Sequence, residues 1–426
     1  MTEKLASYKT TLTTIFAYLH RPVNWQQSFA ALKYRNYRLW FWGQMFSLFG
    51  TWMQATAQGY FVFQLTNSPA YLGYLAFVNG LPTWLFMLYA GVMADRIQRR
   101  TLLIITQTSM MILAFILAAL TFTGIVQAWH IVVLAFGLGI ANAFDAPARQ
   151  SFVLEMVERE DLTNAIALNS AMFNSALALG PAIGGVTYAW FGPAWCFAIN
   201  GLSFIAVITA LGLMRLKPQP LKNRQTSTFA DLKEGFQYAT SHPVIRMLVG
   251  LAAVVGLLGF SFVTLLPAWA VHVLGGDATT NGLLQSARGA GALIGALGIA
   301  LLGRFRFKGK VLTVGTFVFP LGLLLFAAMY TLPLALAMLV VVGMASILVL
   351  NLTNALIQTV VEDQLRGRVM GIYTFILFGF MPIGGLIAGT VAEQLDAPLT
   401  VALNALISLS VAILIWIFFP RLRRLE

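Results

Sequence analysis

Long apolar stretches, separated by short polar loops, make up most of this chain. A run of about 20 predominantly apolar residues is long enough to cross a bilayer as an α-helix. Lipid offers no hydrogen-bond partner to an exposed backbone, and an α-helix pairs its backbone groups within the segment. The stretches of suitable length are 39–65, 70–94, 101–123, 130–147, 163–189, 194–214, 245–273, 281–302, 311–330, 333–354, 368–392 and 398–420. The sequence therefore predicts an all-α membrane protein with twelve transmembrane helices.

Composition excludes the soluble classes of protein. Hydrophobic residues make up 59% of the chain and charged residues 10%, whereas a soluble domain has about 25% charged residues. A net charge of +12 would suggest nucleic acid if the basic residues gathered on one soluble face. Here they lie between the apolar stretches, so we expect membrane lipids and no nucleic acid as partners.

Metal, cofactor and enzyme signals are not found in the sequence. Cys196 is the single cysteine and the four histidines are scattered, which leaves no metal-ligand spacing. No Gly-x-x-x-x-Gly-Lys-Ser/Thr loop and no cluster of nucleophile and base is present. We expect no cofactor and no enzymatic activity, and the N-terminal region has no pattern of a removable signal peptide.

Basic residues predict the orientation of the chain in the membrane. All 27 Lys and Arg residues except Arg288 lie in the N-terminal arm, in the tail, or near positions 95, 155, 230, 306 and 365. The other connections, near 67, 127, 192, 276, 331 and 395, have none. Cytoplasmic loops carry the excess of Lys and Arg, so we expect an even number of helices and both termini in the cytoplasm.

The longest polar break divides the chain into two similar halves. Residues 65–73 resemble residues 274–282 at an offset of 209, and 181–185 resemble 382–385, as in a duplicated transporter fold. The predicted organisation is a cytoplasmic arm (1–38), a six-helix bundle (39–214), a cytoplasmic linker (215–244), a second six-helix bundle (245–420) and a cytoplasmic tail (421–426).

The first predicted helix has a polar face. Its polar residues recur at intervals of three and four, which places them on one side of a helix; they are Gln44, Ser47, Thr51, Gln54 and Gln58. Polar side chains in the membrane can bond to a neighbouring helix. Five on one face favour a water-filled central cavity instead.

Arg288 is the one basic residue predicted inside a membrane span. Burying an Arg there costs about 2.5–3.5 kcal/mol on insertion scales, so an intramembrane ion suggests function. Asn281 and Gln285 share its helix face, and the repeat aligns it with Asn79. Arg288 could contact an anionic or polar substrate, extend to the interface, or bridge helices. The substrate-cavity candidates are Gln54, Gln58, Asn79, Gln285 and Arg288.

The loop at residues 91–100 resembles a known signature. Gly91, Asp95 and Arg96, followed by further basic residues, match the Gly-x-x-x-Asp-Arg loop of the major facilitator superfamily, between helices two and three. Gln98 replaces a usual Gly and Met93 a common Leu. The resemblance implies two pseudo-symmetric six-helix bundles.

In relatives with this loop, an acid at the end of helix four pairs with the loop residues. The resemblance therefore implies that an inner latch stabilises an outward-open state. Its members here would be Gly91, Asp95, Arg96, Arg99, Arg100, Asp145 and Arg149. Asp145 is also the one candidate for carrying a proton.

A motif in the fifth predicted helix narrows the resemblance. The residues Gly180, Pro181, Gly184 and Gly185 resemble the Gly-Pro-x-x-Gly-Gly motif of exporters, although close helix packing alone would also explain them. With residues 142–150, they resemble the branch of siderophore exporters of the enterobactin type and of drug exporters.

This resemblance implies a monomeric, proton-coupled exporter of a small hydrophobic or amphipathic molecule in the cytoplasmic membrane. Such a molecule would cross by alternating access. A lysophospholipid flippase of the same fold is the alternative. A receptor or scaffold without transport activity would not require polar groups inside apolar helices.

Overall fold

The structure is a computed structural model that describes residues 29–216, 228–302 and 307–425. Within these ranges, the side chains at positions 87, 88, 91, 92, 94, 95, 228–232, 302 and 424 are not described. The long helices of the first half are α3 (Arg35–Thr66), α4 (Pro69–Arg96), α5 (Arg99–Phe122), α6 (Ala128–Phe152), α7 (Leu162–Phe191) and α8 (Pro193–Leu213). Short 3-10 helices precede α3 and α7: η1 (Ala30–Lys33), η2 (Val153–Glu155) and η3 (Arg159–Asp161).

The second half repeats this arrangement after the amphipathic helix α9 (Thr228–Ser241). Its first span is continuous from Pro243 to Val273 and consists of α10 (Pro243–Val254), the π-turn η4 (Val255–Gly259), α11 (Phe262–Ala268) and the π-turn η5 (Trp269–Val273). The remaining elements are α12 (Ala278–Leu302), α13 (Lys308–Ala327), α14 (Leu332–Val360), α15 (Arg366–Leu395), α16 (Ala397–Phe418) and η6 (Pro420–Arg424).

Ten of these spans, within the described residues, are long and apolar enough to cross a membrane. The helices α3 and α4 have 32 and 28 residues and run alongside them. The mean hydropathy of α3 is reduced by its polar face. Together with the ten, these two helices make the predicted twelve. The structure begins α3 at Arg35, a few residues before the predicted bound, and places α9 within the predicted linker.

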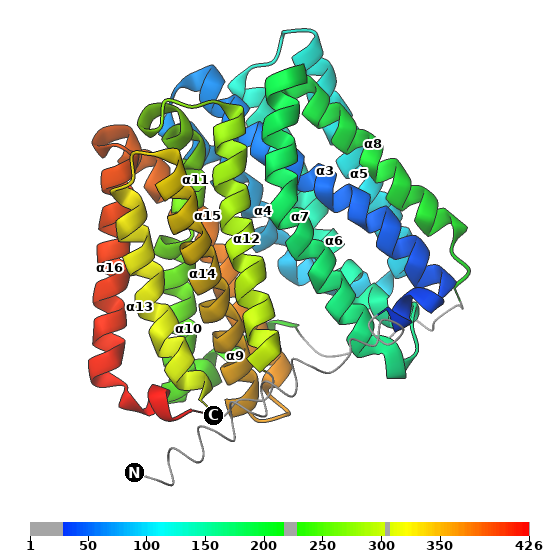
Figure 1. Ribbon diagram of the computed structural model, residues 1–426. Coiled ribbons are helices and arrows are strands. Elements are labelled where there is room, and N and C mark those ends of the chain that lie inside the picture. The colour runs from blue at the N-terminus through cyan, green and yellow to red at the C-terminus, as the bar shows by residue number, and fades with distance from the viewer. Residues whose placement is uncertain (1–28, 217–227, 303–306, 426) are drawn as a thin grey trace.

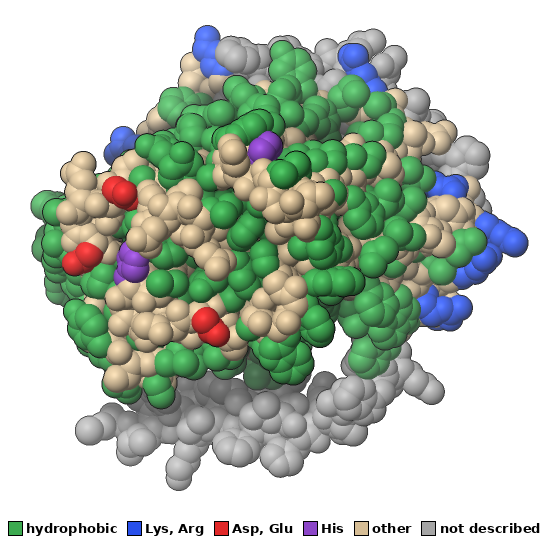
Figure 2. Space-filling view, turned by 90° about the horizontal axis from the view of Figure 1, so that it is seen from above, with side chains coloured by type: hydrophobic (Ala, Val, Ile, Leu, Met, Phe, Trp, Pro, Cys, Tyr) green, Lys and Arg blue, Asp and Glu red, His purple; other side chains and the backbone are tan. Residues whose placement is uncertain are grey.

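Successive helices run in opposite directions, so their connections alternate between two ends of the molecule (Figure 1). One end holds the start of α3 at Arg35, the turn from Arg96 to Arg99 and the start of α15 at Arg366; we call it the basic end. The opposite end is seen in Figure 2, where acidic and histidine side chains lie on the face and Lys and Arg lie toward its edges.

The turn between α3 and α4 shows how the sequence ends and restarts a helix. Asn67 adopts a left-handed conformation with a φ of 50°, which Asn tolerates better than most residues. Ser68 then caps α4, its hydroxyl accepting from the Tyr71 amide at 3.4 Å. Pro69 occupies the first turn, where its missing N–H costs nothing.

The two halves meet along two glycine-lined helix pairs. In α12, a Cβ on Gly282 would lie 3.0 Å from the Cα of Gly185 in α7. In α15, a Cβ on Gly389 would lie 2.8 Å from the Cα of Gly73 in α4. Small residues allow backbones to approach this closely. Gly73 and Gly282 are equivalent in the repeat, so each half offers the same contact to the other.

Large aromatic side chains pack inside each half. Trp269 stacks on Phe326 with ring centroids 4.3 Å apart in the second half, and Trp40 packs edge-on against Phe152 in the first. All four rings are buried. Each half is therefore suited to move as a packed unit.

Candidate functional site

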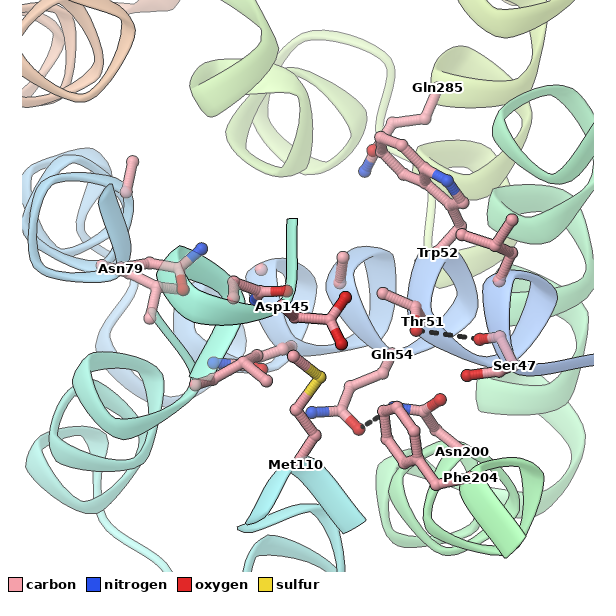
Figure 3. Close-up of a pocket in the computed structure, with 18 of the residues that line it drawn as sticks. Ser47, Thr51, Trp52, Gln54, Asn79, Met110, Asp145, Asn200, Phe204 and Gln285 are labelled. Atoms are coloured by element: carbon pink, nitrogen blue, oxygen red, sulfur yellow. Dashed lines mark hydrogen bonds between the residues drawn. The ribbon is translucent and has the colours of Figure 1, made fainter. Parts of the chain in front are cut away.

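A cavity of about 480 Å³ lies between the halves. Its walls come from α3, α4, α5, α6, α7 and α8 in the first half and from α11 and α12 in the second (Figure 3). Cavities of this size accommodate drug-sized ligands.

The polar face of α3 forms one wall of this cavity. All five residues of the predicted stripe line it: Gln44, Ser47, Thr51, Gln54 and Gln58. Asn200 of α8 donates from Nδ2 to Gln54 Oε1 at 2.7 Å, and the Thr51 hydroxyl donates to the Ser47 carbonyl at 2.8 Å. Gln58 forms no hydrogen bond with any residue that the structure describes, so its amide is available to the cavity.

Two further candidates approach from other sides. Asn79 extends from α4, and Gln285 extends from α12 across the cavity (Figure 3). Gln285 Nε2 donates to Asn281 Oδ1 at 3.4 Å, and Asn281 Nδ2 donates to the Thr56 carbonyl at 3.4 Å. The structure thus brings four of the five substrate-cavity candidates together.

Arg288, the fifth candidate, is buried and 7% exposed, but it is not among the residues that line this cavity. Its backbone packs closely on α14, where a Cβ on Gly343 would lie 2.0 Å from the Arg288 carbonyl oxygen. Among the described residues its side chain has no hydrogen-bond or ion-pair partner, and its Nε is fully buried. Its role as a substrate contact stays a prediction.

Asp145 is held by three side chains at the end of the cavity nearest the basic end. Thr106 and Gln107 of α5 donate to its Oδ1 at 2.9 and 2.8 Å. The Arg149 guanidinium, one helical turn later, lies 3.3 Å from its Oδ2. Both Asp145 and Arg149 line the cavity, and the carboxylate is 1% exposed.

The other predicted latch residues have different partners. Arg99 pairs with Glu155 of η2 at 2.5 Å, and Arg100 donates to the Gly212 carbonyl at 2.8 Å. Arg96 is exposed. The side chains of Gly91 and Asp95 lie outside the described part of the chain. Sequence reasoning missed Glu155, because 56 positions separate it from Arg99 along the chain.

The helix-five motif contacts both α3 and the second half. A Cβ on Gly180 would lie 2.6 Å from Trp52 Cβ, and one on Gly184 would lie 2.9 Å from the Met53 carbonyl oxygen. On the other side, a Cβ on Gly185 would lie 2.6 Å from the Ala278 carbonyl oxygen. The Pro181 carbonyl oxygen lies against Gly282 of α12. The motif therefore lies between α3 and α12.

Hydrogen bonds between the halves lie toward the opposite end, among the residues that the structure describes. Glu393 of α15 accepts from the Ser68 hydroxyl at 2.6 Å and from the Ala70 amide at 3.1 Å. Asn67 and His272 approach within 3.0 Å. Two further bonds join Asn281 to Thr56 and Ala182 to Ser286. The cavity is thus closed off at the opposite end and extends toward the basic end.

Sequence reasoning missed several residues that line the cavity. The amides of Gln107, Asn142 and Asn200 line the cavity, and each lies inside an apolar stretch. A carboxamide isolated within a membrane span is itself a signal that could have identified them.

A family model shows to which family the chain belongs. The model of the transmembrane secretion effector family, MFS_3, matches residues 26–426. The chain belongs to this family. Transmembrane secretion effectors are multi-pass transporters rather than enzymes, and their cargo is a small molecule.

Relatives of this secretion effector include siderophore and drug exporters. It is 25% identical to the staphyloferrin A transporter of Staphylococcus aureus over 83% of this chain and 89% of that one. It is 27% identical to the multidrug efflux pump Tap of Mycolicibacterium fortuitum over 88% and 94%. It is 24% identical to the enterobactin exporter of Salmonella choleraesuis over 84% and 86%. The predicted branch of the superfamily is confirmed.

Solved structures confirm the predicted fold class of the secretion effector. A mutant of the nucleoside transporter NupG superposes with a TM-score of 0.74 at 15% identity, covering 90% of this chain and 99% of that one. The fold is that of a major facilitator transporter with twelve helices in two bundles.

Proposed function

We propose that this secretion effector exports a small hydrophobic or amphipathic organic molecule from the cytoplasm by proton-coupled alternating access. The observation that carries this proposal is the cavity between the halves, with inter-half hydrogen bonds gathered toward one end. Such a site can be offered to one side of a membrane at a time if the halves rock about it.

Orientation decides which side of the membrane the cavity faces in this conformation. The basic end faces the cytoplasm if the positive-inside rule applies, so the cavity in this conformation extends toward the cytoplasm. The relatives support export, since they include an enterobactin exporter and a multidrug efflux pump. Both termini are then cytoplasmic.

Asp145 is the group that we propose for coupling and for the latch. It is an acid that lines the cavity, and three donors hold it in place. We propose that it joins the loop residues Asp95, Arg96 and Arg99 when the basic end closes. The present ion pair between Asp145 and Arg149 then breaks, and both residues take new partners.

The test is an accumulation assay with a locked variant. Cells that express the chain should accumulate less of a siderophore or drug probe than cells without it, and collapsing the proton gradient should remove the difference. The variant Ser68→Cys/Glu393→Cys, joined by a short bis-maleimide, holds the opposite end closed and should stop export. Each single Cys variant, treated alike, is the control. Full export by the linked protein would overturn alternating access.

A side cavity favours a lipid flippase as the second candidate. It has a volume of about 590 Å³, lies among α3, α6 and α7, and shares Gln44, Leu48, Arg149 and Phe173 with the central cavity. Ile166 and Phe173, which line it, are 53% and 44% exposed. A lipid could enter the cavity sideways by this route. Transport of lysophospholipid by purified protein in vesicles would support this candidate over organic-molecule export.

A further inference from the structure

Carboxamides dominate the polar part of the central cavity. Eight Asn and Gln side chains line it, from six helices: Gln44, Gln54, Gln58, Asn79, Gln107, Asn142, Asn200 and Gln285. A carboxamide donates and accepts hydrogen bonds without carrying charge. The wall therefore recognises polar groups by hydrogen bonding.

Several of these amides have hydrogen-bonding capacity that the protein does not use. Gln58, Asn79 and Asn142 form no hydrogen bond with any described residue, and each lines the cavity. Gln44 and Gln107 are each 2% exposed, and each has a side-chain oxygen without a partner in the described part of the protein. Buried polar groups are normally paired. A ligand in the cavity can supply the missing partners.

The wall has no net formal charge. The charged residues that line the cavity are Asp145 and Arg149, and they pair with each other at 3.3 Å. Arg288 lies outside the lining. An ionic group that leaves water for this cavity finds no free counter-ion, and desolvating an unpaired ion is costly. Uncharged polar groups avoid that cost.

Polar and apolar side chains both line the cavity. Seven of the eight amides come from the first half, whereas the second half contributes Val263, Thr264, Pro267 and Gln285. Aromatic rings add apolar surface, with Trp52 and Phe173 in edge contact at 5.8 Å. A ligand that satisfies this lining carries both polar groups and apolar surface.

We infer that the cargo is an amphipathic molecule whose polar groups are uncharged, such as hydroxyls, amides or esters. The polar groups bind the amides, and the apolar surface lies against the aromatic rings and against Val263 and Pro267. This inference rests on the proposed function, because it assumes that the cavity is the cargo site. It identifies Gln58 as a specificity-determining residue.

The test measures occupancy of the cavity without transport. Ala55 lines the cavity and is exposed, and Cys196 is buried. In the variant Ala55→Cys, N-ethylmaleimide should label the new thiol, and a bound probe should slow labelling. Three probes share one chain and differ in charge: hexyl glucoside, hexanoate and hexylamine. Hexyl glucoside should protect at about tenfold lower concentration than the two ions.

Substitutions at position 58 make the test specific. In the Ala55→Cys background, Gln58→Met keeps the size of the side chain and should weaken protection by hexyl glucoside about tenfold. Gln58→Glu adds a charge and should shift the preference toward hexylamine. Gln237→Met, on the exposed face of α9, is the matched control and should change neither value.

The outcomes separate the two proposals. Protection by hexanoate or hexylamine at an equal or lower concentration, or no protection by any probe, would overturn the uncharged cargo class. Neither result would affect the export assay, which uses the locked variant. Protection as expected, with no export from cells, would instead overturn the proposed function and leave the ligand class standing.

Discussion

At the scale of single residues, this protein buries ions in two different ways. Asp145 accepts two hydrogen bonds and one ion pair, whereas Arg288 has no described partner although it is 7% exposed. A buried charge is tolerated when donors or acceptors surround it. The two residues therefore differ in what their replacement should do.

Asp145→Asn should lower export while the protein stays inserted. Charge-assisted hydrogen bonds contribute about 1.5–3 kcal/mol, so we expect a roughly 10- to 100-fold lower export rate. The measurement is probe efflux normalised to protein in the membrane. Asp396→Asn, which changes a cap within α16, is the control. Export unchanged by Asp145→Asn would contradict the latch. The latch hypothesis also predicts that Asp95→Asn lowers export. The structure does not describe the Asp95 side chain.

Arg288→Met should leave the melting temperature unchanged or raise it, because an unpaired buried ion opposes folding. Because Arg288 does not line the cavity, we expect Arg288→Met to reduce export of hexanoate and of hexyl glucoside equally. The measurement is efflux of both probes from the same cells. A larger loss for hexanoate would support the role that the sequence predicts for Arg288, which is to contact an anionic group.

The contact between η1 and η3 should depend on pH. Lys33 Nζ lies 2.6 Å from Asp161 Oδ2, and Tyr34 donates to the same oxygen at 2.8 Å. Lys33 first, and then Tyr34, hold the pKa of Asp161 below its ordinary value, and Asp161 raises the pKa of Lys33. A lowered carboxyl pKa stabilises the fold above the unfolded value, about 3.9 for Asp. That contribution is lost as pH falls through the folded value.

We therefore expect Lys33 and Tyr34 to stay in contact with Asp161 from about pH 5 to about pH 9. The contact should be lost below about pH 4. Ring resonances of labelled Tyr34 in nanodiscs would report it. Asp161→Asn should give a flat profile over the acidic range. A transition near neutral pH in the unchanged protein would refute this assignment.

At the scale of helices, α7 connects the polar wall to the interface between halves. Its Gly180 and Gly184 pack on α3, and Gly185 packs on α12. The residues Pro382, Gly384 and Gly385 occupy the equivalent place in α15, where Gly384 lies against the Leu257 carbonyl oxygen of η4. A helix with such contacts on two sides can transmit motion of one half to the other.

Gly185→Ala should push α7 and α12 apart toward the opposite end. The added methyl group would lie 2.6 Å from the Ala278 carbonyl oxygen, and overpacking typically costs about 1–3 kcal/mol. We expect a roughly 10-fold larger population with the opposite end open, measured by spin-label distances between α7 and α12. Gly250→Ala, where a methyl group meets nothing within 4 Å, is the control. An unchanged distance distribution would contradict this expectation, because it would show that the methyl group fits without separating α7 from α12.

At the scale of the whole molecule, the duplicated sequence produces two equivalent interfaces. Gly73 of α4 meets α15, and its repeat partner Gly282 of α12 meets α7. Farther toward the basic end, α4 and α15 stay in contact where Trp84 stacks on Phe375 at 5.6 Å. Symmetric interfaces of small residues allow the halves to rock without disrupting either core.

Glu393→Ala should favour opening of the opposite end. It removes the bonds to the Ser68 hydroxyl and the Ala70 amide, which join the halves. Because Glu393 is exposed, we expect a shift of about 1 kcal/mol, or roughly fivefold in the ratio of the two states. Spin labels on α4 and α15 would measure it. Asp396→Ala is the control, because Asp396 bonds within its own helix. Equal effects of the two changes would show that Glu393 does not join the halves.

Only part of the cavity wall could be predicted from the sequence. The stripe on α3 follows from spacing alone, since residues three and four apart share a helix face. Gln107, Asn142 and Asn200 lie on three other helices, and no periodicity within one helix can bring them together. Their meeting with α3 depends on how α5, α6 and α8 pack.

The sequence by itself determined the membrane class, the twelve helices, the repeat and the family, because hydrophobic length and local spacing depend on neighbouring residues alone. Tertiary structure alone decided that Arg288 lies outside the cavity lining, that Arg99 pairs with Glu155, and that Glu393 joins the halves. These facts depend on the rotation and separation of packed helices. Contacts between residues more than 300 positions apart, such as Ser68 and Glu393, leave no local pattern in the chain.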